Sequence, residues 1–238
     1  MESHCISEPG QAQQSVNILA MVDEVCRAAG LDPAALDAIA FDAGPGSFTG
    51  LRIACAVAQG LGFALDIPLL PVGSLRVLAW QRVRIGPARA TVFVASDARM
   101  RERYMAAYRL SAPEADRHET DAARLEVVHE PVIVPHAQFD DLVWAWSTQS
   151  RSVDPGTPIV QAGDAWQPLA GDSATSARHL RVETMTGSDD GVIRADAVAE
   201  LARVDWRAGR AMPAGAAAPF YLRDKVALDL EEQRAARA

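Results

Sequence analysis

One stretch of the sequence, residues 38–71, constrains the fold more than any other. Apolar residues occupy alternate positions over 39–43, which is the spacing of a half-buried strand. A Gly-Pro-Gly-Ser-Phe-Thr-Gly heptapeptide follows at 44–50, and no strand continues through Gly-Pro-Gly. Residues 51–65 have the length and alanine content of a helix, with Ser47 as a residue type that caps helices. The sequence therefore predicts a strand, a tight glycine turn and a helix.

The predicted helix at 51–65 has almost no polar face. Its only strongly polar residues are Arg52 and Gln59, which are seven positions apart and so lie on one side. A helix that is apolar nearly all round must be covered on more than one face. Small residues would let a neighbouring backbone approach closely, and they occur at Ala54, Ala56, Ala58, Gly60, Gly62 and Ala64. We expect one face to contact a sheet and the other to contact a partner.

The length and composition favour an α/β protein and argue against direct binding of nucleic acid. The 238 residues are enough for one large domain or two smaller ones, and 49% of them are hydrophobic. The net charge is −8, and Lys225 is the only lysine. Phosphate neutralisation supplies most non-specific affinity for nucleic acid, so we expect any RNA to be held by another protein.

The cysteines and the hydropathy pattern predict a cytoplasmic protein without a membrane span. Cys5, Cys26 and Cys55 are widely spaced, and we interpret them as buried thiols in a reducing compartment. No stretch has about 18 consecutive apolar residues, and residues 1–14 lack the apolar core of a signal peptide.

The rest of the chain alternates between helical and strand-like patterns. An amphipathic helix is predicted at 16–29, and further helices at 74–84, 135–147 and 192–208. Ser74 is expected to cap the helix at 74–84. Strands are predicted at 67–72, 91–95, 104–110, 126–134, 159–162 and 219–223, the fourth of them interrupted by Pro131. The strands at 91–95 and 104–110 should form a hairpin, and 112–125 a loop.

The glycine heptapeptide lacks the features of the known phosphate loops. A Walker A loop needs a lysine, and the dinucleotide fingerprint GxGxxG has one residue fewer between its last glycines. Backbone N–H groups at a helix start still attract anions. Two roles for the turn therefore stay open: a purely structural one, and an anion site formed by Gly46, Ser47 and Thr49. No catalytic group and no metal site is predicted, since no two of the five histidines have the spacing of metal ligands.

The stretch DAGPGSFTGLRIACAVAQGLGFALDIPLLPVGSL resembles the TsaB (YeaZ) family, a subunit of the bacterial machinery that makes threonylcarbamoyladenosine in tRNA. Three further segments match the family in the same order, namely 21–31, the hairpin at 96–108 and PFYLRDKVA at 219–227. The resemblance thus runs from about residue 19 to residue 227. GPGSFTGLR is shared with the catalytic paralogue TsaD, whereas DARM and YLRDKVA point to TsaB itself.

The resemblance implies an α/β, actin-like/Hsp70-like (ASKHA) two-lobed fold, with a first lobe at 1–110 and a second lobe at 111–238. It implies a non-catalytic scaffold for threonylcarbamoylation of N6 of adenosine 37 in ANN-decoding tRNAs. The implied partners are a TsaD-type transferase, a TsaE-type ATPase, tRNA only through the complex, and a second copy of the chain. The resemblance implies that ATP and a metal are bound by the TsaD-type partner and that this chain has no cofactor of its own. The implied docking residues are Ile18, Val22, Val25, Leu51, Arg52, Ala54, Cys55, Ala58, Gln59 and Gly62.

One departure from the family concerns the N-terminal side. Family members begin with a strand carrying an ILAIDTST-like phosphate loop and a β-hairpin, before the helix that corresponds to 16–29. We expect these strands of the first lobe to be missing, with a start codon placed too far downstream. Two other functions stay open: a free-standing actin-like ATPase or M22-type peptidase, and a homodimeric interaction module without an RNA connection.

Overall fold

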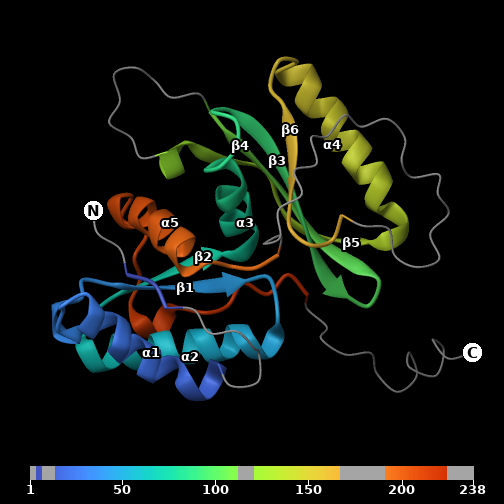
Figure 1. The fold of residues 1–238 in the computed structure, drawn as a ribbon. Helices are drawn as coiled ribbons and strands as arrows, with labels where there is room; N and C mark the ends of the chain where they lie inside the picture. The colour runs from blue at the N-terminus through green and yellow to red at the C-terminus, as the bar shows by residue number, and fades with distance from the viewer. Residues whose placement is uncertain (1–3, 7–13, 112–120, 167–190, 224–238) are drawn as a thin grey trace, which may run out of the picture.

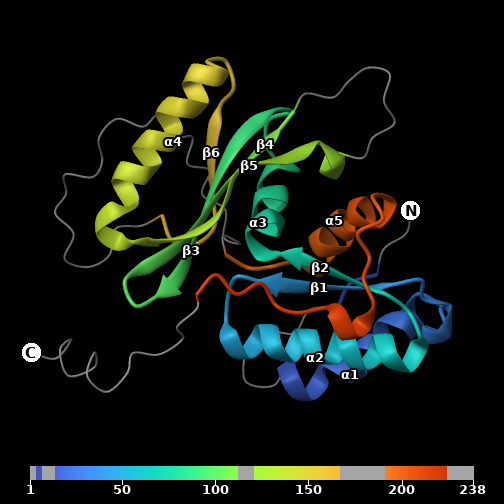
Figure 2. The same cartoon turned by 180° about the vertical axis from the view of Figure 1, so that it is seen from behind.

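A computed structural model describes residues 4–6, 14–111, 121–166 and 191–223 of the chain. Two sheets and the helices between and around them form successive layers (Figures 1 and 2). A four-stranded sheet lies between α4 (Phe139–Val153) on one side and α3 (Ser74–Val83) with α5 (Ala195–Arg207) on the other. A two-stranded sheet follows beyond α3 and α5, and α2 (Phe48–Leu65) and α1 (Gln14–Ala28) lie at its far side.

The two-stranded sheet is built from the stretch that the sequence singles out. Strand β1 (Ile39–Gly44) leads through the glycine turn into α2 (Phe48–Leu65), and β2 (Leu69–Gly73) returns parallel to β1. Ser47 is the N-cap of α2, and its hydroxyl accepts a hydrogen bond from the Gly50 N–H. The predicted strand, turn and helix are therefore confirmed.

The four-stranded sheet has the order β5-β4-β3-β6. Strands β3 (Ala90–Arg99) and β4 (Glu102–Leu110) form the predicted antiparallel hairpin. Strand β5 (Leu125–Pro135) pairs antiparallel with β4, and β6 (Ile159–Ala162) pairs parallel with β3. Pro131 does not interrupt β5 as expected, because the register shifts between Met105 and Ala107 and leaves Pro131 in a bulge.

Four helices complete the layers. They are α1 (Gln14–Ala28), α3 (Ser74–Val83), α4 (Phe139–Val153) and α5 (Ala195–Arg207), with short 3-10 turns at Pro33–Ala35, Asp121–Arg124, His136–Gln138 and Ala214–Ala216. The expected cap of α3 is wrong. Gly73 is the N-cap, and Ser74 is the first helical residue and bonds to Asp42 instead.

The layers bury three groups of apolar side chains. The largest group joins both sheets, since Leu70 and Val72 of β2 share it with Val92 and Val94 of β3 through α3 and α5. A second group lies between the four-stranded sheet and α4, where Phe93 meets Trp146 edge to face. The third lies between β1, β2 and α2. The middle layer of helices therefore binds the two sheets into one packed unit.

The C-terminal described segment returns to the two-stranded sheet. Residues 219–223 are not the strand that was expected, since the single backbone bond from the Phe220 N–H to the Ala43 carbonyl makes no ladder. The division of the chain at residue 110 stays a prediction. In the structure, β3 and β4 before that residue share one sheet with β5 and β6 after it.

The cysteines are placed differently from one another. Cys26 and Cys55 are buried as expected, and burial raises the pKa of the Cys55 thiol. Cys5 is exposed, so the prediction of three buried thiols is wrong for this residue. It lies in the short described segment 4–6, where the neighbouring His4 is exposed as well.

Candidate functional site

The glycine turn is held by a half-buried carboxylate that sequence reasoning missed. Asp42 Oδ1 accepts a hydrogen bond from the Ser74 hydroxyl at 2.5 Å and from the Gly44 N–H at 3.1 Å. Burial raises the pKa of Asp42, and these two hydrogen bonds oppose that shift. Gly44 has φ +98°, and a Cβ there would lie 2.6 Å from Leu51 Cδ1. The turn therefore fixes the start of α2 against the ends of β1 and β2.

The residues proposed as an anion site line a cleft of about 670 Å³ between the glycine turn and the β3–β4 hairpin. Gly46, Ser47 and Thr49 all face this cleft, but so do the carboxylates Asp42, Asp97 and Asp164. Of the cleft's cations, Arg99 pairs with Asp97 and Arg223 with Glu102. Carboxylates around the cleft disfavour a bound anion. Anion binding stays a prediction, and the described residues contain no cluster of three potential metal ligands.

Arg52 is exposed at the N-terminal end of α2 and lies against two aromatic rings. Its guanidinium carbon is 3.7 Å from the centroid of the Phe48 ring, and its Nε donates to the Tyr221 hydroxyl at 3.2 Å. Tyr221 is a contact that sequence reasoning missed, because it lies 169 residues further along the chain. This cluster attaches the C-terminal described segment to the start of α2.

The face of α2 toward the sheet is buried in the chain's own core. Leu51, Cys55, Ala58 and Gly62 are buried there. A Cβ at Gly62 would lie 2.9 Å from Leu69 Cδ2 and 3.0 Å from Ala214 Cβ. Four of the predicted docking residues are therefore buried within the chain in this structure.

Gln59 shows how the segment at Ala214–Ala216 packs against α2. Its Nε2 donates to the Ala214 carbonyl at 3.3 Å and to the Ala217 carbonyl at 3.0 Å. The predicted docking residue Gln59 thus has an internal role, which is to bind one carbonyl group of this turn and one directly after it, about which the local sequence is silent because Ala214 is 155 residues away. No local pattern in the sequence signals this contact.

A second face of α2 is open to solvent, and we call it the exposed face of α2. It consists of Thr49, Arg52, Ala56, Gly60, Phe63 and Ala64, all of which are exposed. Phe63 is 67% exposed, which is unusual for a phenylalanine in a folded chain. Nothing lies within 4 Å of a Cβ built on Gly60. This face combines small residues, an aromatic side chain and one arginine.

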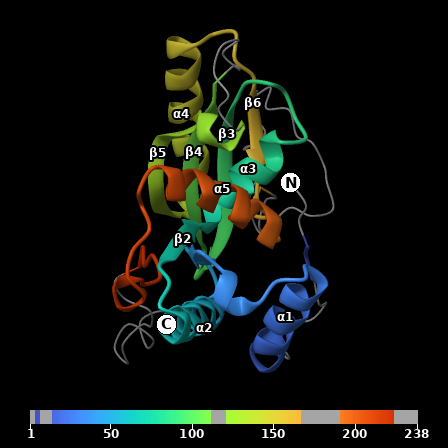
Figure 3. The same cartoon turned by 90° about the vertical axis from the view of Figure 1, so that its left-hand side faces the viewer.

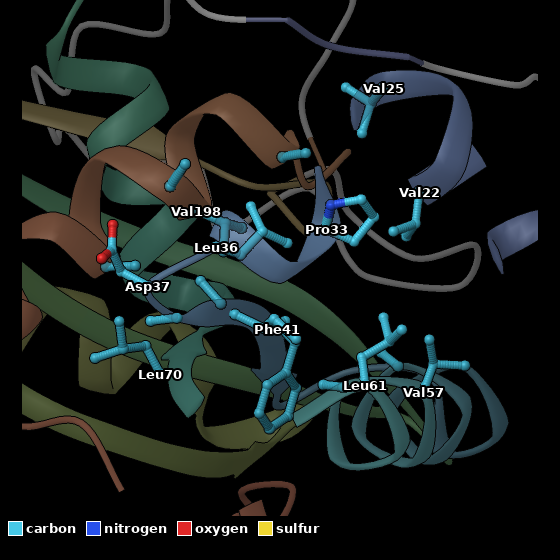
Figure 4. Close-up of a pocket in the computed structure, with 18 of the residues that line it drawn as sticks. Val22, Val25, Pro33, Leu36, Asp37, Phe41, Val57, Leu61, Leu70 and Val198 are labelled. Carbon is cyan, nitrogen blue, oxygen red and sulfur yellow. The ribbon is translucent and has the colours of Figure 1, made fainter. Parts of the chain in front are cut away.

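A third face of α2 lines a large apolar hollow that we call the β1-edge groove. The groove has a volume of about 1020 Å³ and lies along β1 between α1, α2 and α5 (Figures 3 and 4). The predicted docking residues Ala54 and Ala58 line it from α2, and Val57 and Leu61 do so beside them. One helix thus contributes to the core, to an exposed surface and to a groove.

The apolar stripe of α1 lines the same groove. Ile18, Val22 and Val25, predicted as docking residues, form its wall opposite β1, and each is half-buried. In this arrangement they are directed toward the groove and not toward the exposed face of α2. The predicted docking residues are therefore not one surface. Five of them line the groove, and one of these, Ala58, is also buried. Of the other five, Leu51, Cys55 and Gly62 are buried in the chain, Gln59 is half-buried, and Arg52 is on the exposed face of α2.

Helix α2 also has the length and the mean hydropathy, 1.4, of a helix that could cross a membrane. Composition alone does not distinguish such a span from a core helix. The packing of α2 on β1 and β2, its Ser47 cap and the hydrogen bonds of Gln59 make it an integral helix of this folded unit.

Layered mixed sheets with a cleft beside a strand, a glycine turn and a helix define an α/β protein of the actin-like (ASKHA) class. The family model described as "TsaD: tRNA N6-adenosine threonylcarbamoyltransferase" matches residues 8–125. The tRNA threonylcarbamoyladenosine biosynthesis protein TsaB of Haemophilus influenzae is 31% identical over 93% of this chain and 84% of its own length. The chain belongs to the TsaB (YeaZ) family.

Two further relatives agree with this assignment. TsaB of Escherichia coli is 30% identical over 90% of this chain and 83% of its own length. The solved structure of YeaZ from Pseudomonas aeruginosa superimposes with a TM-score of 0.66 and 29% identity, covering 91% of this chain and 89% of that one. The predicted family and fold class are therefore confirmed.

Proposed function

We propose that this chain is a non-catalytic subunit of the tRNA threonylcarbamoylation machinery and that it binds a TsaD-type transferase. Family membership supports the pathway, since the relatives named above are threonylcarbamoyladenosine biosynthesis proteins. The observation that carries the docking role is the exposed face of α2. Small residues there let a second helix approach closely, and Phe63 offers an apolar anchor.

The docking surface proposed from the structure differs from the one implied by the sequence. Leu51, Cys55 and Gly62 are buried by the chain itself, whereas Ala56, Gly60 and Phe63 are accessible. We therefore assign the partner contact to these three residues and Arg52. The same face is the candidate for self-association in the absence of a partner.

The remaining roles in the complex follow from the same proposal. The transferase holds the ATP and the metal, and this chain holds no cofactor of its own. The tRNA is bound only by the assembled complex, because this chain has a net charge of −8. A TsaE-type ATPase is the third protein component, and the cytoplasm is the proposed location.

Reconstitution of the modification reaction tests the role directly. Purified TsaD-type and TsaE-type proteins, the threonylcarbamoyl-adenylate-forming enzyme and an ANN-decoding tRNA are combined with and without this chain. We expect threonylcarbamoyladenosine to form only when this chain is present. Equal product in both reactions would exclude a role in the complex.

A charge placed on the exposed face of α2 tests the docking surface. Ala56→Glu should abolish co-purification with the TsaD-type protein, because a carboxylate would be desolvated in the contact. The matched control is Ala145→Glu, which changes an exposed alanine on α4 at the far side of the molecule. Retained co-purification in the Ala56 variant would show that the partner binds elsewhere.

The isolated chain also allows a test against the enzymatic alternatives. A free-standing ATPase or peptidase should hydrolyse ATP or a peptide without any partner. We expect no hydrolysis by this chain above the rate of a buffer control. A rate that saturates with substrate and falls in an Asp42→Asn variant would support the enzymatic alternative, since Asp42 lines the cleft.

A further inference from the structure

The turn between β3 and β4 has a backbone conformation that its residues do not favour. Met100 and Arg101 are the two residues between the strands, and their φ angles are +55° and +59°. Positive φ at both positions is typical of a type I′ hairpin turn, which usually carries Asn or Gly there. Residues with longer side chains are strained in this conformation. Backbone preference therefore does not account for a methionine at the tip of this hairpin.

The sulfur of Met100 is held by a guanidinium from the other end of the described chain. Arg223 Nη1 donates to Met100 Sδ at 2.9 Å. Its Nη2 donates to the Ala98 carbonyl at 3.2 Å and pairs with the Glu102 carboxylate. A thioether sulfur is only a weak acceptor, so the contact of Nη1 is the weakest of the three. Arg223 is therefore held firmly at one nitrogen and loosely at the other.

Residues 220–223, which we call the strap, join the two walls of the cleft between the glycine turn and the hairpin. At one end of the strap, the Phe220 N–H donates to the Ala43 carbonyl at 2.7 Å. At the other end, Arg223 is attached to the β3–β4 hairpin (Figures 1 and 2). All four strap residues line the cleft. The hold of the hairpin on Arg223 therefore determines how firmly the strap connects the two walls.

Met100 is also the most exposed methionine among the described residues. It is 49% exposed, whereas Met105 is fully buried and Met21 and Met212 are half-buried. Oxidants reach exposed side chains first, because a buried sulfur reacts only when the surrounding structure opens. Hydrogen peroxide thus has direct access to the sulfur of Met100.

Oxidation of this sulfur would place a strong acceptor beside the Nη1 donor. A sulfur lone pair attacks one oxygen of hydrogen peroxide and the O–O bond breaks. The hydrogen on the transferred oxygen passes to the departing hydroxide, which leaves as water, and the sulfur has lost two electrons as a sulfoxide. The methionine side chain is flexible enough to turn the new oxygen toward the guanidinium. Hydrogen bonds from charged donors are the strong ones, so Arg223 would then be held firmly at both nitrogens.

We propose that Met100 is an oxidation site whose sulfoxide tightens the attachment of the strap to the β3–β4 hairpin. A peroxide is the oxidant. A methionine sulfoxide reductase restores the thioether with two electrons from a dithiol, and the oxygen leaves as water. The strap is thus fastened more firmly in the oxidised chain than in the reduced one. This inference does not rest on the proposed function, because it concerns the cleft and the hairpin and not a partner contact.

The test compares the whole chain before and after mild treatment with hydrogen peroxide. Peptide mapping by mass spectrometry gives the oxidation rate of each methionine. Hydrogen exchange of the Phe220 amide reports how often the strap detaches from β1. We expect Met100 to oxidise at least about tenfold faster than the buried Met105. We expect the Phe220 amide to exchange at least about threefold more slowly in the oxidised chain.

Two variants identify the groups responsible. Met100→Leu keeps an apolar side chain of similar size but has no sulfur, and Arg223→Gln keeps a polar side chain but has no guanidinium. In each of them, peroxide should leave the exchange of the Phe220 amide unchanged. The matched control Met21→Leu removes a half-buried sulfur on α1 and should keep the full response. The exposed Cys5 is present in all of these chains, so its oxidation cancels in the comparison.

Reduction provides a second check, since methionine sulfoxide reductase with dithiothreitol should restore the original exchange rate of the Phe220 amide. Four results would overturn the inference. They are oxidation of Met100 no faster than that of Met105, exchange of Phe220 that is unchanged or faster after oxidation, the same slowing in the Met100→Leu or Arg223→Gln variant, and a slowing that the reductase does not reverse.

Discussion

His129 in β5 is a titratable residue whose surroundings disfavour its charged form. Its ring stacks on Trp146 of α4 with centroids 4.3 Å apart, and its Nε2 is buried without a hydrogen-bond partner among the described atoms. Burial lowers the pKa of His129 below its usual value of 6.5. Protonation therefore favours the unfolded chain, where the imidazole is fully solvated.

We predict that His129 makes the protein less stable in weak acid. The unfolded state takes up its proton first as the pH falls through 6.5, so the free energy of unfolding decreases from there until the folded imidazole is also protonated. His129→Phe keeps a flat ring against Trp146 but cannot titrate. Urea unfolding at several pH values should show a smaller loss of stability in this variant. An unchanged pH dependence would mean that other groups cause it.

Two glycines of α2 separate helix propensity from packing at the scale of the element. Alanine is favoured over glycine in a helix by up to about 1 kcal/mol. Gly60 is open, so Gly60→Ala should stabilise the protein by about that amount. At Gly62 a new Cβ would lie 3.1 Å from the Ile67 carbonyl oxygen and close to Leu69 and Ala214. Gly62→Ala should therefore lower the melting temperature, although its propensity gain is the same.

The comparison of these two variants is the measurement that matters. Thermal unfolding of both should give shifts of opposite sign. Equal increases in melting temperature would contradict this prediction. They would show that α2 can move away from β2 and the Ala214–Ala216 turn at little cost in free energy, so that the close packing at Gly62 does not limit stability.

Helices α3 and α5 are joined by an ion pair on a buried carboxylate. Asp205 of α5 is 5% exposed and accepts hydrogen bonds from Arg76 of α3 and from Arg210, both at 2.7 Å. Asp205→Asn would leave the Arg76 guanidinium, whose side chain is 17% exposed, without its counter-charge. We expect a loss of about 3 kcal/mol in the free energy of unfolding.

The control for this ion pair is the surface pair Arg27–Asp23, whose side chains are 70% and 66% exposed. Asp23→Asn should cost no more than about 1 kcal/mol, because exposed ion pairs are weak. Chemical denaturation of both variants measures the difference. Similar small losses would indicate that water reaches Arg76 once Asp205 is neutral.

At the scale of the whole molecule, the two sheets should unfold together. One group of buried side chains includes Leu70 and Val72 of the two-stranded sheet and Val92 and Val94 of the four-stranded sheet. Separating the sheets would expose all of them to water, at about 25 cal/mol for each Å² of apolar surface. We predict a single transition in urea, with the same midpoint by tryptophan fluorescence and by far-ultraviolet circular dichroism. Two separated midpoints would contradict this prediction.

The local elements of the fold could be predicted from the sequence because their signals are local. The strand and glycine turn before α2, the Ser47 cap and the β3–β4 hairpin depend on residues within a few positions of one another. The buried stripe of Phe139, Val143 and Trp146 on α4 follows from helical periodicity. The bulge at Pro131 was missed, because it depends on the register of a neighbouring strand.

The roles of the predicted docking residues could be only partly predicted, because their neighbours are distant in the chain. Periodicity indicates correctly that α2 is apolar on several sides. It does not indicate that Gln59 contacts Ala214 and Cys55 contacts Ala217, or that the α1 stripe lines a groove. Such contacts depend on tertiary packing between residues far apart in the chain, which the local pattern of a single sequence does not reveal.

The attachment of the Ala214–Ala216 turn to α2 has a consequence for the order of events on the ribosome. Gln59 is synthesised 155 residues before Ala214, an interval of roughly 10–30 s at ordinary translation rates. Throughout that time β1 and β2 can cover part of this face of α2, but the part that later contacts Ala214 and Ala217 has no covering segment. A stalled or shortened nascent chain would therefore leave the Cys55, Gln59 and Gly62 side of α2 partly open to chaperones.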